Sequence, residues 1–239
     1  MVPRLFMSVA LNKGASCALS AAQHHYLLHV LRRKDGDMVE IFNGRDGLWL
    51  GQLVKGFLYV QEQVCVQPVP LAPRRLAYSP IKQQDWLIQK AVELGVTHFQ
   101  PIWCDRTVVR HEKSDRLEKI AIEACEQCKR LDVPMMLPAV TLKDCWKSQK
   151  EMHDDHLFSA LRNNGGGVVL DPQASSHITD MAQRPQWILV GPEGGWSPEE
   201  LNHFDQHAGV RRCHVGSRIL RAETAALVAA TFLDWFPET

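Results

Sequence analysis

The chain has 239 residues, of which 45% are hydrophobic and 23% are charged, with 27 basic and 27 acidic side chains. This composition supports a buried core and excludes an intrinsically disordered chain. The sequence contains no apolar run of the roughly 18 residues that a membrane span needs. Seven cysteines without a framework spacing predict a reduced, cytoplasmic protein.

The charge is distributed unevenly along the chain. Residues 1–75 carry nine basic and five acidic side chains, whereas residues 151–239 carry six basic and twelve acidic ones. Either chance scatter of surface charge or a polyanionic partner that contacts mainly the N-terminal part would give this distribution.

The first part of the chain is predicted to be rich in β-strands. Ser20 is the expected cap of a helix over residues 21–32. Short apolar runs separated by turn-forming Asp, Asn and Gly residues predict strands at 38–42, 48–50 and 64–66. Short strands with frequent turns are typical of a small barrel. Three prolines within residues 67–73 predict a stiff linker, so we expect domains at 1–72 and 73–239.

The second part alternates predicted strands and helices, which indicates a parallel sheet covered on both faces. Apolar runs predict strands at 76–78, 96–103, 135–140, 168–170, 187–190 and 210–215. Apolar spacings of three and four predict helices at 82–94, 114–130 and 222–235. Ser197, followed by Pro198 and then by Glu200, has the signature of a further helix start.

Two glycine-bearing stretches, Gly191–Gly195 and Val215–Ala225, each follow a predicted strand and precede a helix. Ligands of parallel α/β sheets bind outside the carboxyl ends of the strands, so both stretches are candidate binding loops. For the first, the alternative is an ordinary strand–helix turn. In the second, Arg221 and Glu223 either pair with each other, or Arg221 stabilises a developing anion while Glu223 or Thr224 orients a substrate.

Other familiar site motifs do not occur. The sequence has neither G-x-G-x-x-G nor G-x-x-x-x-G-K-[ST], which argues against the common dinucleotide and P-loop sites. Cys125 and Cys128 lie on the apolar face of a predicted helix without a second pair, so we expect buried thiols and no metal site. Clustering of Arg32, Arg33 and Lys34 beside a turn favours phosphate contact, although solvated surface is the default for each basic residue singly.

Five segments occur in the order known from one protein family. They are His29–Arg32 followed by Gly36-Asp37, Ile88–Val96, Glu123–Gln127, Leu189–Gly195 and Arg218–Ala225. Together they resemble the RsmE family of ribosomal RNA methyltransferases over nearly the whole chain.

The resemblance implies a PUA-like β-barrel at 1–72 that helps to hold RNA, and an α/β SPOUT domain at 73–239 with a deep C-terminal trefoil knot. It implies a cytoplasmic homodimer that uses S-adenosylmethionine, without a metal, to methylate N3 of one uridine in 16S rRNA. The expected partner is therefore the small ribosomal subunit, and the expected role is rRNA processing in ribosome biogenesis.

The resemblance also assigns site residues. The cofactor site would comprise Leu170, Leu189, Gly191, Glu193, Gly194, Val215, Gly216, Ile219 and Leu220. Arg221 would stabilise the uracil anion as the leading catalytic residue, with Glu223 as its orienting partner or, alternatively, as the base. The expected RNA-binding residues are Arg4, Arg32, Arg33, Lys82, Lys90 and Arg106. Cys104-Asp105-Arg106 stands where the family more often has Ser-Glu-Arg, so only Arg106 carries over there.

The sequence leaves two alternatives open. One is a SPOUT methyltransferase that acts on another RNA or another base. The other is a non-catalytic RNA-binding or ribosome assembly factor that keeps the fold, against which the intact Gly191–Gly195 loop and Arg221 argue.

Overall fold

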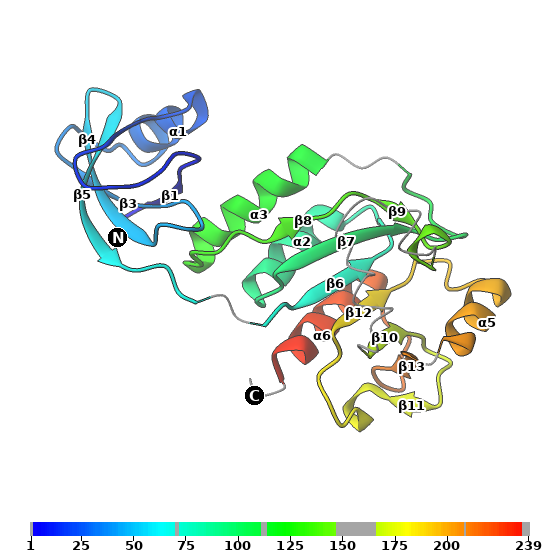
Figure 1. Cartoon of the computed structure of the whole chain (residues 1–239). Helices are drawn as coiled ribbons and strands as arrows, with labels where there is room; N and C mark the ends of the chain where they lie inside the picture. The colour runs from blue at the N-terminus through cyan, green and yellow to red at the C-terminus, as the bar shows by residue number, and fades with distance from the viewer. Residues whose placement is uncertain (1, 70–71, 111–113, 147–165, 208, 236–239) are drawn as a thin grey trace. The chain divides into compact units, whose positions relative to one another are not determined.

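The computed structural model describes residues 2–69, 72–110, 114–146, 166–207 and 209–235 (Figure 1). The chain divides into two compact units, the first comprising Met1–Leu71 with Ile122–Val133 and the second Ala72–Ala121 with Pro134–Thr239. Nothing in the local sequence pattern pointed to the membership of Ile122–Val133 in the first unit. Among the described residues, no helix is long and apolar enough to cross a membrane.

The first unit is built on a five-stranded sheet. Its elements are β1 (Arg4–Phe6), β2 (Ser16–Ala18), α1 (Ala21–His25), the π-helical segment η1 (Tyr26–Val30), β3 (Met38–Phe42), β4 (Leu48–Val54) and β5 (Phe57–Cys65). The strands lie in the order β1-β3-β4-β5-β2, in which β1 is parallel to β3 and the other neighbours are antiparallel.

The predicted elements of this unit are largely confirmed. The helix expected at 21–32 is present as α1 and η1, and the Ser20 side chain caps it by accepting the Gln23 N–H at 3.2 Å. The strands expected at 38–42 and 48–50 are β3 and the first part of β4. Of the apolar run at 64–66, only Val64 and Cys65 belong to β5. The strand begins earlier, at Phe57, where its first four residues alternate between exposed and buried positions.

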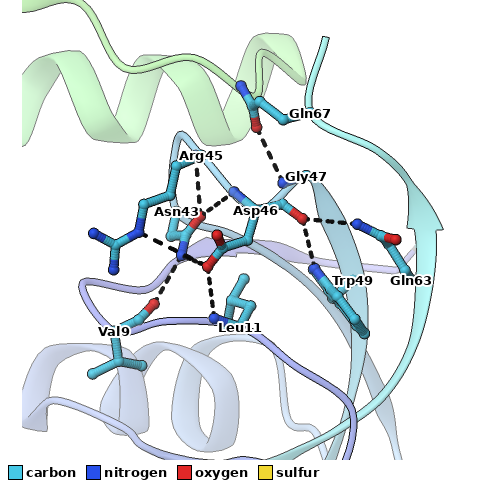
Figure 2. Close-up of polar contacts among 9 residues, drawn as sticks. All are labelled: Val9, Leu11, Asn43, Arg45, Asp46, Gly47, Trp49, Gln63 and Gln67. Atoms are coloured by element: carbon cyan, nitrogen blue, oxygen red, sulfur yellow. Dashed lines mark hydrogen bonds and ion pairs between the residues drawn. The ribbon is translucent and has the colours of Figure 1, made fainter.

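The turn between β3 and β4 gathers polar contacts within the first unit (Figure 2). The Asp46 carboxylate accepts the Leu11 N–H at 2.8 Å and the Asn43 amide at 2.6 Å. These two hydrogen bonds, the one from Leu11 foremost, lower the pKa of Asp46. The Asp46 carbonyl accepts the Trp49 indole N–H at 2.8 Å and the Gln63 amide at 3.0 Å. One turn therefore fastens the N-terminal segment to both β4 and β5.

The C-terminal part of helix α3 (Ser114–Cys128) also contributes to the first unit. Glu126 accepts the Phe6 N–H at 2.8 Å. Arg4 pairs with Glu40 at 2.8 Å and donates to the Lys129 carbonyl at 2.6 Å. Burial raises the pKa of Glu126 to about 7, an effect that the hydrogen bond from Phe6 opposes.

The second unit is an α/β structure. Its strands are β6 (Arg75–Tyr78), β7 (His98–Trp103), β8 (Met135–Met136), β9 (Val140–Thr141), β10 (Gly167–Leu170), β11 (Ser176–His177), β12 (Trp187–Val190) and β13 (Val210–His214). Its helices are α2 (Gln84–Glu93), the first part of α3, η2 (Asp144–Trp146), η4 (Ile178–Asp180), α5 (Pro198–Gln206) and α6 (Ala222–Trp235).

The predicted parallel sheet is confirmed. The strands lie in the order β11-β13-β10-β12-β6-β7-β8, with β9 also on β7, and each of these pairings is parallel. The single strand expected at 135–140 is wrong, since the segment forms the two short strands β8 and β9. Pro138, which lies between them, has no N–H for the ladder and so interrupts the strand.

The order of the last three long strands determines where their loops lie. The chain runs from β10 to β12 and then to β13, yet β13 pairs with β10 on the side opposite β12. Because all three strands are parallel, their carboxyl ends share one edge of the sheet. Beneath that edge lies a core that includes Ala77, Ile102, Val169, Trp187 and Leu189.

Candidate functional site

A cavity of about 440 Å³ lies in the second unit where the carboxyl ends of β10, β12 and β13 meet. Its size falls within the range of small-molecule sites, about 300–1,000 Å³. The last residues of the three strands, Leu170, Val190 and His214, line it together with the loops that follow β12 and β13. The two glycine-bearing loops predicted from the sequence therefore share one cavity.

The loop after β12 is fixed by Trp196 and by the cap of α5. Trp196 donates its indole N–H to the Leu170 carbonyl at 2.9 Å, which ties the loop to the end of β10. A Cβ at Gly191 would lie 2.7 Å from the Trp196 ring, so glycine is needed for the indole to pack there. The predicted helix start is confirmed, because Ser197 and Glu200 each accept the other's backbone N–H, at 3.2 and 2.8 Å.

The loop after β13 has supports of its own. His214 Nδ1 accepts the Gly216 N–H at 3.2 Å, and the His214 ring packs edge-to-face on His177 with centroids 5.0 Å apart. On the side of β10, the buried Asp171 carboxylate accepts a hydrogen bond from Arg212 at 2.8 Å and forms a charge pair with it. Asp171 lines the cavity beside Leu170, so this segment forms a third wall.

Most of the residues predicted for a cofactor line this cavity. They are Leu170, Gly191, Glu193, Val215, Gly216, Ile219 and Leu220. The two others lie elsewhere. The Leu189 side chain is 0% exposed within the sheet core, because neighbouring strand residues point to opposite faces. Gly194 lies against the side chain of Arg106.

The cavity also has lining residues that the sequence prediction missed. They include Gln83, Asp171, Pro172, Pro192, His214 and Arg218. Asp171 and Pro172 directly follow a predicted strand, which was a usable signal for ligand contact. Gln83 comes from the segment before α2, far from the other lining residues along the chain, so only the folded sheet brings it there.

Arg221 and Glu223 both line the cavity. Glu223 lies in the first turn of α6, is 9% exposed, and its Oε2 has no hydrogen-bond partner among the described residues. The ion pair between Arg221 and Glu223 that the sequence suggested is not formed within the described part of the chain. A buried carboxylate oxygen without a partner is costly, and a ligand N–H in the cavity would satisfy it.

The predicted RNA-binding residues are distributed over both units. In the first unit, Arg4 is engaged with Glu40 and the Lys129 carbonyl, Arg32 has a positive φ of 52°, and Arg33 lies 4.0 Å from Asp37.

In the second unit, Lys82 is exposed, and Lys90 pairs with Glu93 at 2.8 Å. The Arg106 guanidinium donates to the Gly194 carbonyl at 2.9 Å. Arg4 and Arg106 thus have structural contacts that their sequence context did not indicate.

Cys125, the first cysteine of the C-x-x-C pair, is a buried thiol. Burial raises the pKa of Cys125 to about 12, and its thiol donates to the Asp132 carbonyl at 3.5 Å. A thiol held protonated in this way is a poor metal ligand. Within the residues that the structure describes, no cluster of three His, Cys, Asp or Glu side chains could hold a metal ion.

Comparison with known proteins agrees with this architecture. Residues 70–234 match the family model of the RNA methyltransferase domain, and residues 19–62 match that of the RNA methyltransferase PUA domain. The chain is 32% identical to the ribosomal RNA small subunit methyltransferase E of Rickettsia conorii, over 95% of this chain and 92% of that protein. It is 31% identical to the Synechocystis protein of the same name, over 90% of this chain and 71% of that protein.

Solved structures give the same result. The Neisseria gonorrhoeae ribosomal RNA small subunit methyltransferase E bound to S-adenosylmethionine is 28% identical, with a TM-score of 0.77 over 96% of this chain and 95% of that chain. A putative Legionella pneumophila methyltransferase in complex with the same cofactor is 25% identical, with a TM-score of 0.79 over 98% and 97% of the two chains. From the matched domains and these relatives, the chain belongs to the ribosomal RNA small subunit methyltransferase E family.

Proposed function

We propose that this chain transfers the methyl group of S-adenosylmethionine to N3 of one uridine in 16S rRNA of the small ribosomal subunit. The observation that carries the proposal is the cavity at the carboxyl ends of β10, β12 and β13, lined by both glycine-bearing loops and by Arg221 and Glu223. Relatives are named as ribosomal RNA small subunit methyltransferases, and two similar structures hold the methyl donor.

The residues present fit S-adenosylmethionine. The donor carries a flat adenine, an ammonium group and a sulfonium, and so needs apolar walls together with negative charge. The cavity offers Leu170, Ile219 and Leu220 as apolar surface and the carboxylates of Glu193 and Glu223 as negative charge. The partnerless, buried Oε2 of Glu223 is suited to accept an N–H of the bound cofactor or substrate.

Methylation of uracil N3 requires the protein to stabilise the uracil anion. When bound, S-adenosylmethionine supplies an electrophilic methyl group. Uracil N3 becomes a good nucleophile once it loses its proton, and the negative charge then spreads over the two carbonyl oxygens. A guanidinium at the cavity mouth stabilises that charge, which is the role proposed for Arg221. The two loops hold the reacting atoms in line.

We assign Glu223 a hydrogen-bonding role rather than that of the base. A carboxylate is a much weaker base than the uracil anion, so deprotonation of N3 by Glu223 is unfavourable, and we assign the proton to a solvent base, hydroxide or buffer. The absence of an ion pair to Arg221 among the described residues leaves the Glu223 carboxylate available to orient the base or the cofactor directly. This replaces the expected role of Glu223 as an orienting partner of Arg221.

The remaining features are proposed by family membership. Residues 1–72 would form the PUA-like β-barrel that holds RNA, in line with the PUA match at 19–62, and residues 73–239 the SPOUT domain with its trefoil knot. RNA contacts are proposed at Arg32, Arg33, Lys82 and Lys90. A reducing cytoplasmic setting is proposed as well, and the seven cysteines, none of which forms a disulfide within the described residues, are compatible with it.

A homodimer is proposed in the same way. Two large apolar side chains of the second unit, Trp86 and Ile219, are 45% and 86% exposed in the single chain, and a subunit contact would cover them. Sedimentation of the purified protein measures its mass in solution, and a monomer at micromolar concentration would refute this part.

The decisive experiment for the activity uses small subunits from cells that lack the modification. The protein is incubated with these subunits and labelled S-adenosylmethionine, and the product is identified by nucleoside mass spectrometry and mapped by primer extension. N3-methyluridine at a single 16S position is expected. A different methylated base or another RNA would indicate another SPOUT activity, and RNA binding without cofactor binding would indicate a non-catalytic factor.

A further inference from the structure

The loop that follows β12 is held from outside the cavity by the turn that follows β7. Arg106, in that turn, donates from Nη1 to the Gly194 carbonyl at 2.9 Å. Arg106 is not among the residues that line the cavity, and neither is Gly194, although Gly191, Glu193 and Gly195 are. The Gly194 carbonyl therefore faces the turn while its neighbours face the cavity.

The side chain of Arg106 lies directly against the backbone of Gly194. A Cβ at position 194 would lie 3.2 Å from Arg106 Cβ, closer than most such contacts, and 3.5 Å from Arg106 Cδ, an ordinary van der Waals distance. The missing Cβ lets the arginine side chain lie directly against the loop backbone. Gly194 thus serves the contact with Arg106, whereas the sequence suggested contact with the cofactor.

A second tie joins the same turn to the end of the loop. The Ser197 hydroxyl donates to Asp105 Oδ2 at 2.7 Å, and the Asp105 N–H donates to Glu200 Oε1 at 2.9 Å. Ser197 and Glu200 are buried, and they also cap α5. The start of α5 is therefore fixed to the turn independently of Arg106.

A third tie fixes the turn to the start of the loop. Thr107 accepts the Cys104 N–H at 2.8 Å, and its hydroxyl shares a hydrogen bond of 2.7 Å with Ser79, which is buried like Thr107. The Ser79 N–H in turn donates to the carbonyl of Val190, the last residue of β12, at 2.9 Å. Both ends of the loop are thus hydrogen-bonded, directly or through Ser79, to one turn, and Arg106 contacts its middle.

We propose that Arg106 is a positioning residue for cofactor binding, which holds the Gly194 carbonyl so that the backbone of Gly191–Gly195 keeps the shape of the cavity wall. A loop that is already ordered loses less conformational freedom when the ligand binds, so the contact raises affinity for the cofactor. This inference rests on the proposed function. It differs from the role of RNA contact that the sequence suggested for Arg106.

The test is calorimetric titration of S-adenosylmethionine into the full-length protein without RNA. Arg106→Ala is expected to raise the dissociation constant about tenfold, the effect of losing one charge-assisted hydrogen bond. Arg106→Lys keeps a donor and a positive charge and is expected to recover most of the affinity. Arg116→Ala is the matched control, because Arg116 is an exposed arginine of the same unit that pairs with Asp85.

Steady-state rates separate positioning from RNA contact. Arg106→Ala should raise KM for S-adenosylmethionine about tenfold while kcat at saturating cofactor stays within about threefold. Unchanged cofactor affinity together with weaker RNA binding would overturn the inference and restore the RNA role. A wild-type protein that binds no S-adenosylmethionine would instead overturn the proposed function.

A second variant covers the case in which Arg106→Ala fails to fold. Gly194→Ala keeps Arg106 and adds only the Cβ that would lie 3.2 Å from the arginine. It should displace the arginine from the loop and weaken cofactor binding with little change in the thermal midpoint of unfolding. Wild-type cofactor affinity in Gly194→Ala would overturn the positioning role.

Discussion

Replacement of Arg221 by alanine separates catalysis from folding in this protein. Arg221 is exposed at the cavity, directly before α6, and no hydrogen bond or ion pair of its side chain is formed with the described residues. Its carbonyl accepts the Ala225 N–H at 2.9 Å, a contact that alanine retains. We therefore expect the free energy of unfolding to change by no more than about 0.5 kcal/mol.

The expected catalytic loss is much larger. If the guanidinium meets the negative charge of the uracil anion, its removal costs about 2.7–4 kcal/mol of transition-state stabilisation, or roughly 10²–10³ in turnover. The affinity for S-adenosylmethionine should stay within about threefold, because the stabilised charge develops on the RNA base. Arg221→Lys keeps the positive charge but lacks the planar guanidinium, so its turnover should lie between those of the wild type and Arg221→Ala.

The assay is single-turnover methyl transfer to hypomethylated small subunits at saturating enzyme and cofactor, with denaturant unfolding of the same preparations. Arg211→Ala is the control, because Arg211 is an exposed arginine of β13 that does not line the cavity. Near-normal turnover of Arg221→Ala would remove Arg221 from the mechanism. An equal loss in Arg211→Ala would show that the effect is not local to the cavity.

Three further predictions concern the carboxylates of Glu223, Glu126 and Asp46. Glu223→Gln replaces a buried carboxylate whose Oε2 lacks a partner among the described residues. It should raise the free energy of unfolding by about 0.5–1 kcal/mol and lower turnover about tenfold. A lower free energy of unfolding in denaturant melts would contradict this prediction. The pKa of Glu126 is raised to about 7, so the folded state binds its proton more tightly than the unfolded state and stability falls as the pH rises from about 4.5 through 7. After allowance for partial exposure, the loss of stability attributable to Glu126 is about 1–2 kcal/mol. Denaturant melts of the wild type and of Glu126→Gln at pH 4.5 and pH 7 measure it, because the glutamine variant lacks this pH-dependent loss. An equal pH dependence in the two proteins would contradict the reasoning. Asp46→Ala loses the hydrogen bonds from Leu11 and Asn43 and should destabilise the first unit by about 2–3 kcal/mol, as measured by the urea midpoint, whereas an unchanged midpoint would mean that water replaces them.

Much of the local structure could be predicted because the signals are local. The capping boxes at Ser20 and Ser197 depend on residues three positions apart, and both are formed as expected. The alternation of strand and helix likewise predicted the parallel sheet. The strand expected at 135–140 is the exception. The prediction followed the apolar run and did not take account of Pro138, which interrupts the strand.

The candidate site was predicted in part for the same reason. Both glycine-bearing loops follow strands and precede helices, a pattern visible within a dozen residues, and both line the cavity. Leu189 was included because it lies in the same motif, but a motif carries no information on which face of the sheet a side chain takes. The missing pair between Arg221 and Glu223 depends on side-chain directions that sequence spacing alone does not determine.

The sequence by itself determined most of the longer elements, the caps at Ser20 and Ser197, the parallel sheet and the two loops, because each depends on residues close together in the chain. Only the tertiary structure decided that β13 pairs with β10 opposite β12, which brings the two loops into one cavity. It alone decided that the turn containing Arg106 holds the first loop and that Ile122–Val133 joins the first unit. These arrangements are contacts between distant segments, and they are set by which packing buries the whole core rather than by any local pattern.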